Sequence, residues 1–146
     1  MAHASIFLVT LFMSFFGKSP ASDPTTLEAN VVSNRWKHRV ILVYAQTNGA
    51  ADLQKQRKLL AEQQKGLAER DFELIIAVGA DLLAVDKQYL RGGDRQLPAS
   101  ARFMTYLIGK DGGVKQRFAT PVGPAELFRI VDSMPMRQSE MRRRGE

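Results

Sequence analysis

The chain has 146 residues, of which 45% are hydrophobic and 25% are charged, a composition typical of one globular domain. It contains no cysteine, which excludes disulfides, thiol catalysis, zinc–thiolate sites and iron–sulfur clusters. The formal net charge of +6 favours anionic partners such as acidic protein surfaces, lipid headgroups or nucleic acid. A soluble protein with a positive surface and no anionic partner would carry the same charge, so charge alone identifies no ligand.

An apolar run at residues 6–16 is interrupted only by Thr10 and Ser14. It is shorter than the roughly 20 residues of a transmembrane helix, but it has the length of a signal-peptide core. Small residues at positions 19 and 21 predict cleavage after Ala21, although no Lys or Arg precedes the run. A buried first strand or helix is the alternative. A cleaved signal peptide predicts a periplasmic or secreted protein, with no transmembrane helix in its mature form.

Residues 22–34 are mostly polar and contain Pro24, so we expect a linker there, with a short turn of helix at residues 26–31. A continuous run of β-forming residues follows at 40–45 (VILVYA), which predicts a strand buried on both faces. Trp36 precedes this strand, and we expect it to pack over the sheet.

The next segments predict a β–α–β unit. An Asn-Gly turn follows the first strand, and Asp52 can cap a helix that runs to about Arg70. An apolar stripe along this helix is formed by Leu53, Leu60 and Leu67. Residues 72–78 (FELIIAV) predict a second strand. A helix of this length between two strands predicts parallel pairing with a right-handed crossover.

Residues 79–102 show no clear pattern apart from a short helix at 81–90. Residues 103–108 and 114–118 then predict two strands, because the Asp-Gly pair between them is a hairpin signal. Lys115 and Arg117 alternate with apolar residues on the last strand, which is typical of a sheet edge.

A final helix is predicted after the hairpin, with Pro124 in its first turn. Pro135 interrupts this helix, and we expect residues 136–146 to be a basic, frayed extension. The order of elements is that of a minimal thioredoxin-like α/β domain, with a central mixed sheet of about four strands flanked by helices. The predicted segments are a signal peptide at 1–21, a linker at 22–34, the domain at 35–136 and a basic tail at 137–146.

Four parts of the chain carry a family resemblance: residues 36–45 (WKHRVILVYA), the helix with Gln56 and Arg57, the hairpin 107–115 (LIGKDGGVK) and the ending 126–137. Together they resemble a bacterial family of exported domains of unknown function. The same domain occurs in secreted animal matrix proteins of the sushi-repeat and equarin types. The resemblance covers residues 36–144 and implies a thioredoxin-like fold, but it implies no particular activity.

The redox site of thioredoxins is missing from this sequence. That site is a Cys-x-x-Cys motif just after the first long strand, where residues 44–52 offer no thiol. Dithiol exchange and cysteine-dependent peroxidase chemistry are therefore excluded. The position of the usual cis-proline falls near Phe103 or Met104, and neither is proline. The missing thiols and the missing proline thus predict a non-redox domain.

Other catalytic or cofactor motifs are not evident. His38 is the only histidine after cleavage, and its neighbours Lys37 and Arg39 are typical of a surface position. No His, Asp or Glu cluster has the spacing of metal ligands, so we expect neither a metal nor another cofactor. The G-x-x-G sequence at 109–112 joins two predicted strands rather than two helices, so it predicts a turn and no specific nucleic-acid recognition.

A first candidate site lies at the carboxyl end of the first strand, where Tyr44, Gln46, Thr47 and Asn48 supply polar side chains. Ligands of open α/β sheets bind at the carboxyl ends of the strands, which favours a ligand site here. The alternative is an ordinary loop with a helix cap.

A second candidate site is the tail, where Arg137, Arg142, Arg143 and Arg144 outnumber two glutamates. These arginines could dock onto anionic lipid, nucleic acid or an acidic partner. The alternative is a solvated helix end.

Three functions remain open from the sequence. The preferred hypothesis is a non-redox module that binds an envelope or extracellular protein, or another envelope component, outside the cytoplasm. The second is an enzyme without cysteine, or a small-ligand binder, that uses the polar residues after the first strand. The third is electrostatic attachment to anionic surfaces through the arginine tail.

Overall fold

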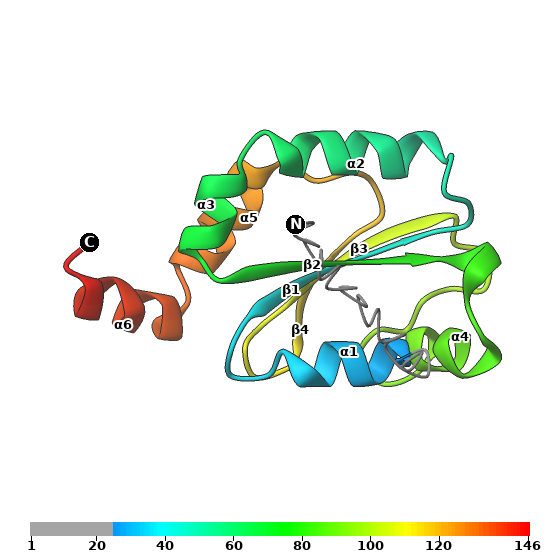
Figure 1. Ribbon diagram of the computed structural model, residues 1–146, viewed down its shortest axis with the longest axis horizontal. Coiled ribbons are helices and arrows are strands. Elements are labelled where there is room, and N and C mark those ends of the chain that lie inside the picture. Colours follow the sequence, from blue (N-terminus) through cyan, green and yellow to red (C-terminus); the bar gives the residue numbers. More distant parts are fainter. Residues whose placement is uncertain (1–24) are drawn as a thin grey trace, which may run out of the picture.

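The structure, a computed structural model, describes residues 25–146 (Figure 1). The expected signal peptide lies outside the described residues. Among the described residues, a mixed sheet of four strands lies between two layers of helices, which confirms the predicted α/β class. No helix among residues 25–146 is long and apolar enough to cross a membrane. The elements are α1 (Leu27–Ser33), β1 (Arg39–Ala45), α2 (Ala51–Ala61), α3 (Gln64–Glu69), β2 (Phe72–Val78), the 3₁₀ turn η1 (Gly79–Asp81), α4 (Ala84–Arg91), β3 (Phe103–Ile108), β4 (Val114–Phe118), α5 (Pro124–Asp132) and α6 (Pro135–Arg144).

The strand order in the sheet is β2-β1-β3-β4. β1 runs parallel to β2 and antiparallel to β3, and β3 and β4 form an antiparallel hairpin. The predicted parallel β–α–β pair and the predicted hairpin are both confirmed. Gly112 has φ +87° in the hairpin turn, a conformation that glycine adopts without strain. β4 lies at one edge, as Lys115 and Arg117 predict.

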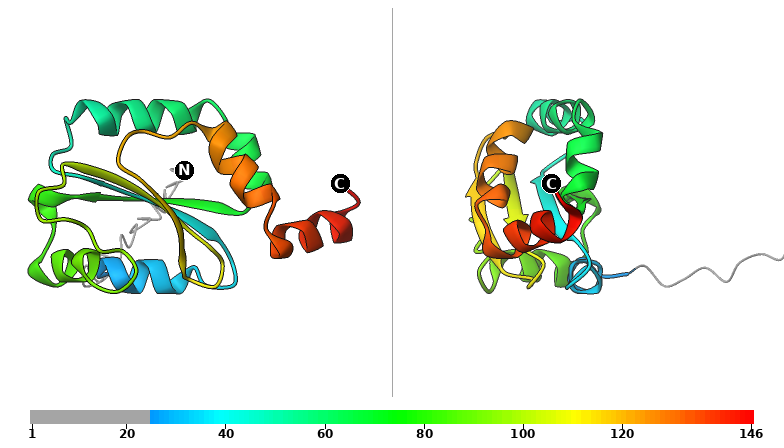
Figure 2. Two further views of the ribbon diagram at one scale, coloured as in Figure 1. Left: turned by 180° about the vertical axis from the view of Figure 1, so that it is seen from behind. Right: turned by 90° about the vertical axis from the view of Figure 1, so that its left-hand side faces the viewer.

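Strand β1 separates two hydrophobic core clusters because its side chains alternate between the two faces of the sheet. Val40 and Leu42 belong to the cluster under α1 and α4, whereas Ile41 and Val43 belong to the cluster under α2 and α5. All four side chains are buried. Figures 1 and 2 show α2 over one face of the sheet and α1 with α4 over the other.

The segment expected as a linker contributes to the core. Within it, residues 27–33 form α1, and Leu27 and Val31 are buried in the cluster that includes Val40. The Leu27 amide donates to Oδ1 of Asp86 on α4 at 2.8 Å, which ties the two helices together. The folded unit therefore starts before residue 35, because its first apolar side chains have partners far along the chain.

The single helix expected from Asp52 to Arg70 is two helices, α2 and α3. Gln63 breaks them apart with φ −131°, and α2 begins after Ala50 without a side-chain cap from Asp52. Gly66 in α3 has a packing reason: a Cβ there would lie 2.7 Å from ring atoms of Phe128 on α5. The break and the glycine together bring α3 against α5.

The C-terminal residues differ most from their expectation, because residues 135–144 form helix α6 rather than a frayed extension. Arg137 and Glu140 on this helix are buried. The Glu140 carboxylate accepts hydrogen bonds from Arg39 at 3.1 Å and from Lys110 at 2.7 Å. Arg39 is the first residue of β1, so ion pairs dock α6 against the start of the central strand.

Acid should weaken this docking. Burial raises the pKa of the Glu140 carboxyl, but hydrogen bonds from Lys110 and Arg39 outweigh burial and hold that pKa below its usual value of 4.5. The hydrogen bond from Arg70 is the main reason why the pKa of Asp132 also lies below its usual value. A carboxyl with a lower pKa in the folded state stabilises the fold above its unfolded-state pKa, and this stability is lost as the pH falls through the folded-state pKa.

We therefore expect the melting temperature to change little between pH 7 and about pH 5 and to fall steeply below about pH 4. Thermal unfolding followed by circular dichroism across this range measures the effect. A melting temperature that stays constant down to about pH 3 would show that these carboxylates do not contribute as described.

Candidate functional site

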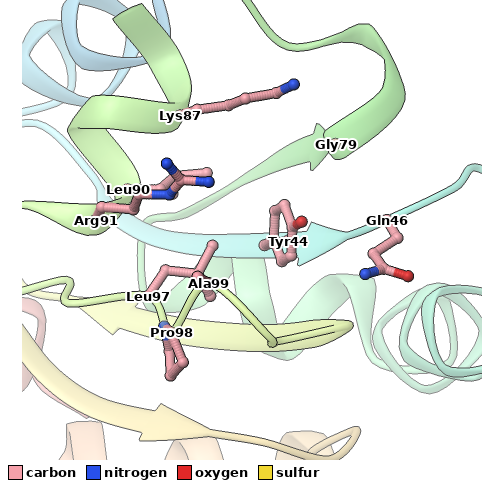
Figure 3. Close-up of a pocket in the computed structure, with 9 residues that line it drawn as sticks. All are labelled: Tyr44, Gln46, Gly79, Lys87, Leu90, Arg91, Leu97, Pro98 and Ala99. Carbon is pink, nitrogen blue, oxygen red and sulfur yellow. The ribbon is translucent and has the colours of Figure 1, made fainter. Parts of the chain in front are cut away.

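A cavity of about 170 Å³ lies at the carboxyl ends of the parallel strands β1 and β2 (Figure 3). Carboxyl ends of parallel strands meet at one edge of a sheet, which is where open α/β sheets bind ligands. The lining comes from β1, the end of β2, α4 and the loop before β3. It consists of Tyr44, Gln46, Gly79, Lys87, Leu90, Arg91, Leu97, Pro98 and Ala99.

The first part of the lining is the end of β1. Tyr44 is half-buried in the strand, and Gln46 follows it on the surface. The main chain of Gln46 is fixed on both sides: its amide donates to the Arg102 carbonyl, and its carbonyl accepts from the Ala80 amide, both at 3.1 Å. The side chain of Gln46 is thereby held at the cavity while its amide group makes no hydrogen bond within residues 25–146.

Gly79 directly follows β2, and its lack of a side chain leaves the space next to the Tyr44 hydroxyl free. A Cβ at Gly79 would lie 3.0 Å from that hydroxyl and 3.4 Å from Cα of Gln46. Any side chain here would therefore displace Tyr44 or narrow the cavity. Glycine keeps the hydroxyl in position and the cavity open.

Helix α4 brings two cations to the cavity. Lys87 and Arg91 lie four residues apart and so share one face of the helix. Both side chains are exposed, and neither makes an ion pair or a side-chain hydrogen bond within residues 25–146. The cavity lining contains no Asp or Glu. The site therefore has two positive charges and no neighbouring carboxylate in its lining to neutralise them.

The apolar part of the lining consists of Leu90, on α4 beside Arg91, together with Leu97, Pro98 and Ala99 of the following loop. The Leu97 amide donates to the Leu90 carbonyl at 2.9 Å, which ties the loop to the last turn of α4. The lining therefore combines this apolar part with the exposed cations of α4.

The chemistry of the cavity suits an anionic ligand. The Tyr44 hydroxyl, the Gln46 amide, the Lys87 ammonium and the Arg91 guanidinium are all hydrogen-bond donors. The lining holds no carboxylate or imidazole that could act as a general base. Among residues 25–146 there is also no group of three or more His, Asp or Glu that could hold a metal ion.

Two of the four residues predicted at the carboxyl end of β1, Tyr44 and Gln46, are brought together in the cavity; Thr47 and Asn48 lie outside its lining. Asn48 is turned toward α2, because its Oδ1 accepts from Nη2 of Arg57 at 3.1 Å.

The sequence interpretation missed Gly79 and the two cations of α4. The i,i+4 spacing of Lys87 and Arg91 was the available signal, since it places both on one helical face. Their position over Tyr44 depends on how α4 packs, which no local pattern gives.

The four arginines of the tail do not form one exposed group. Arg137 is only 2% exposed, with Nη2 2.8 Å from a carboxylate oxygen of Glu146. Arg144 pairs with Asp71 at 3.0 Å. Arg142 and Arg143 remain exposed. Two of the four predicted arginines are therefore already paired with carboxylates inside the protein, and Arg142 donates to the Ser139 hydroxyl at 3.0 Å.

Comparison with known proteins places the chain beside a family of domains and a longer animal protein. The profile of a domain of unknown function, DUF4174, matches residues 31–140. A protein of Danio rerio named coiled-coil domain-containing protein 80 is 26% identical over 140 residues. This alignment covers 81% of the chain but only 16% of the length of the Danio rerio protein. The chain is thus similar to one small part of a much longer relative.

Proposed function

The chain belongs to the DUF4174 family of domains of unknown function, and we propose that it is a non-redox binding domain for a small anionic group, a phosphate or a carboxylate. The observation that carries this proposal is the pair of unpaired cations, Lys87 and Arg91, beside Tyr44 at the carboxyl end of the sheet. A parallel β–α–β unit followed by a hairpin and a helix supports the further proposal that the fold is thioredoxin-like.

Charge and size both favour a small anion. A phosphate or carboxylate would receive charge-assisted hydrogen bonds from Lys87 and Arg91, and guanidinium binds such groups with two parallel bonds. A cavity of about 170 Å³ is large enough to hold several water molecules. That space fits an inorganic phosphate, a short carboxylic acid or the anionic end of a larger partner.

The same lining favours binding over catalysis. The lining has no carboxylate or imidazole, the commonest general bases, so Tyr44 and Lys87 are its two side chains that could transfer a proton. The anion can belong to a free solute or to a protein or envelope component that displays it. The apolar run at 6–16 supports export, so we place the mature domain in the periplasm or outside the cell.

NMR titration with inorganic phosphate and with acetate, at constant ionic strength, tests the location of the site. We expect saturable chemical-shift changes at the amides of Gln46, Gly79 and Leu97. Gly79→Ala should weaken binding without changing the charge, because its Cβ would come within 3.0 Å of the Tyr44 hydroxyl.

Gly49→Ala is the matched control, because the same added methyl group would have no atom within 4 Å. It should bind phosphate like the unmodified protein. Shift changes that gather at Arg142 and Arg143, or that never saturate, would count against the cavity as the binding site.

A further inference from the structure

The turn between α1 and β1 displays Trp36, which was expected to pack over the sheet. Its side chain is instead 69% exposed, and its φ is +65°. A left-handed backbone conformation is unfavourable for a bulky residue. Because the Trp36 side chain is exposed, no burial of apolar surface offsets this cost. Such a conformation is kept where the surrounding structure enforces it, and it is concentrated at functional positions.

Main-chain hydrogen bonds hold this turn rigid. The Trp36 amide donates to the Lys110 carbonyl in the β3–β4 turn at 2.8 Å. The amides of Lys37 and His38 both donate to the Asn34 carbonyl, at 3.0 and 2.9 Å. The indole is therefore presented to solvent by a fixed scaffold. In Figures 1 and 2 this turn, the β3–β4 turn and α6 lie at the same end of the molecule.

The residues around Trp36 combine positive charge with apolar surface. Arg35 and Lys37 flank it, are exposed, and make no ion pair or side-chain hydrogen bond within residues 25–146. Val32, four residues earlier on α1, is 42% exposed. The exposed residues Val32, Arg35, Trp36 and Lys37, which are neighbours in the chain at this turn, are together called the Trp36 surface below.

We propose that the Trp36 surface docks onto an anionic lipid bilayer. Tryptophan concentrates at the membrane–water interface because its ring is amphipathic, and cations beside it are attracted to anionic headgroups. A single indole projecting from a turn suits a soft headgroup layer, which deforms around it. A protein partner would instead need a matching pocket.

Docking in this way would leave the proposed anion site accessible. The Trp36 surface precedes the first residue of β1, whereas Tyr44 lies at the other end of this seven-residue strand. A strand of that length separates its ends by roughly 20 Å, at about 3.3 Å per residue. The cavity would face away from the bilayer, and the proposal does not depend on what the cavity binds.

Trp36 is the only tryptophan in the chain, so its fluorescence reports on this surface alone. The protein is mixed with vesicles of phosphatidylcholine alone and with vesicles that also contain phosphatidylglycerol. The apolar run at 6–16 could itself bind lipid, so each variant is compared with its parent both as the full chain and as a chain starting at residue 22. The shorter chain retains all the core residues that the structure describes.

We expect a blue shift of Trp36 emission with the phosphatidylglycerol vesicles and none with phosphatidylcholine alone. Arg35→Gln/Lys37→Gln should weaken vesicle partitioning about thirtyfold, since each cation near such a surface contributes about fivefold. Lys55→Gln/Lys58→Gln removes the same charge from the exposed face of α2 and should leave partitioning nearly unchanged.

Trp36→Gly separates membrane binding from stability, with vesicle sedimentation as its readout. Because glycine adopts positive φ freely, this variant should melt at the same or a higher temperature and yet lose vesicle binding. A lower melting temperature would assign Trp36 a structural role and overturn the proposal. An absent blue shift, or equal effects of the two charge variants, would also overturn it. Binding to poly-glutamate but not to vesicles would overturn it too, and would indicate an acidic protein partner.

Discussion

Replacing Glu140 by glutamine is expected to lower the free energy of unfolding by about 3–5 kcal/mol, the usual effect of removing one partner from a buried ion pair. Arg39 and Arg137 have side chains only 2% exposed, and Glu140 is itself 5% exposed. The substitution keeps the shape of the side chain but leaves Arg39 buried without its carboxylate partner, whereas Arg137 keeps Asp132 and Glu146. Urea unfolding followed by circular dichroism measures the change.

Glu126→Gln is the matched control for Glu140→Gln. Glu126 pairs with Arg129 at 2.6 Å on the exposed side of α5, where solvent screens the attraction. This variant should leave the unfolding free energy nearly unchanged. If both variants had similarly small effects, ion pairing through Glu140 would not be what holds α6 on the domain.

Gln56→Ala should have a comparable effect, about 3–5 kcal/mol, because it deletes a buried amide with three hydrogen bonds. Gln56 is 1% exposed on α2. Its Oε1 accepts from the Val122 amide at 2.8 Å and from the Thr105 hydroxyl at 3.1 Å, and its Nε2 donates to the Val122 carbonyl at 2.8 Å. Alanine would leave those three groups buried without partners, and urea unfolding gives the loss directly.

Two further variants identify the cause of the Gln56 effect. Gln54→Ala removes an exposed glutamine from the same helix, with one hydrogen bond to the Asn48 carbonyl, and should cost little. Gln56→Glu keeps the shape, but at pH 7 it must either ionise, in which case it cannot donate to the Val122 carbonyl, or take up a proton in the core at a cost in free energy. It should therefore be nearly as unstable as Gln56→Ala. A stable Gln56→Glu would mean that the hydrogen bonds of Gln56 matter less than its packing.

The strands were predictable because their signals are local. The run at 40–45 is apolar on both faces, and β1 is the central strand between β2 and β3. The Asp-Gly turn predicted the hairpin, and Lys115 and Arg117 predicted its edge position. None of these features depends on residues far away in the sequence.

The first and last helices, α1 and α6, were not predictable because partners far away in the sequence determine them. The pair of Arg39 and Glu140 spans 101 positions, and Leu27 bonds to Asp86 across 59. Without those partners, α1 looks like a polar linker and α6 like a frayed tail. Trp36 was misplaced because apolar character normally predicts burial, and no sequence pattern shows that its backbone adopts a positive φ.

The candidate site was half predictable for the same reason. Tyr44 and Gln46 follow from the rule that ligands bind at the carboxyl ends of strands. Lys87 and Arg91 reach the cavity only because α4 packs beside β2 and a loop of irregular sequence closes the wall. That packing positions the two positive charges on which the proposed function rests.

The most direct test of the anion site is calorimetric titration of phosphate into the unmodified protein and into Lys87→Gln/Arg91→Gln. We expect saturable one-site binding that this double variant weakens at least about tenfold, because each charged hydrogen bond contributes about 1.5–3 kcal/mol. Lys55→Gln/Lys58→Gln, with the same net charge, should bind like the unmodified protein. Equal weakening by both double variants, or no saturable binding to the unmodified protein, would contradict an anion site at this end of the sheet.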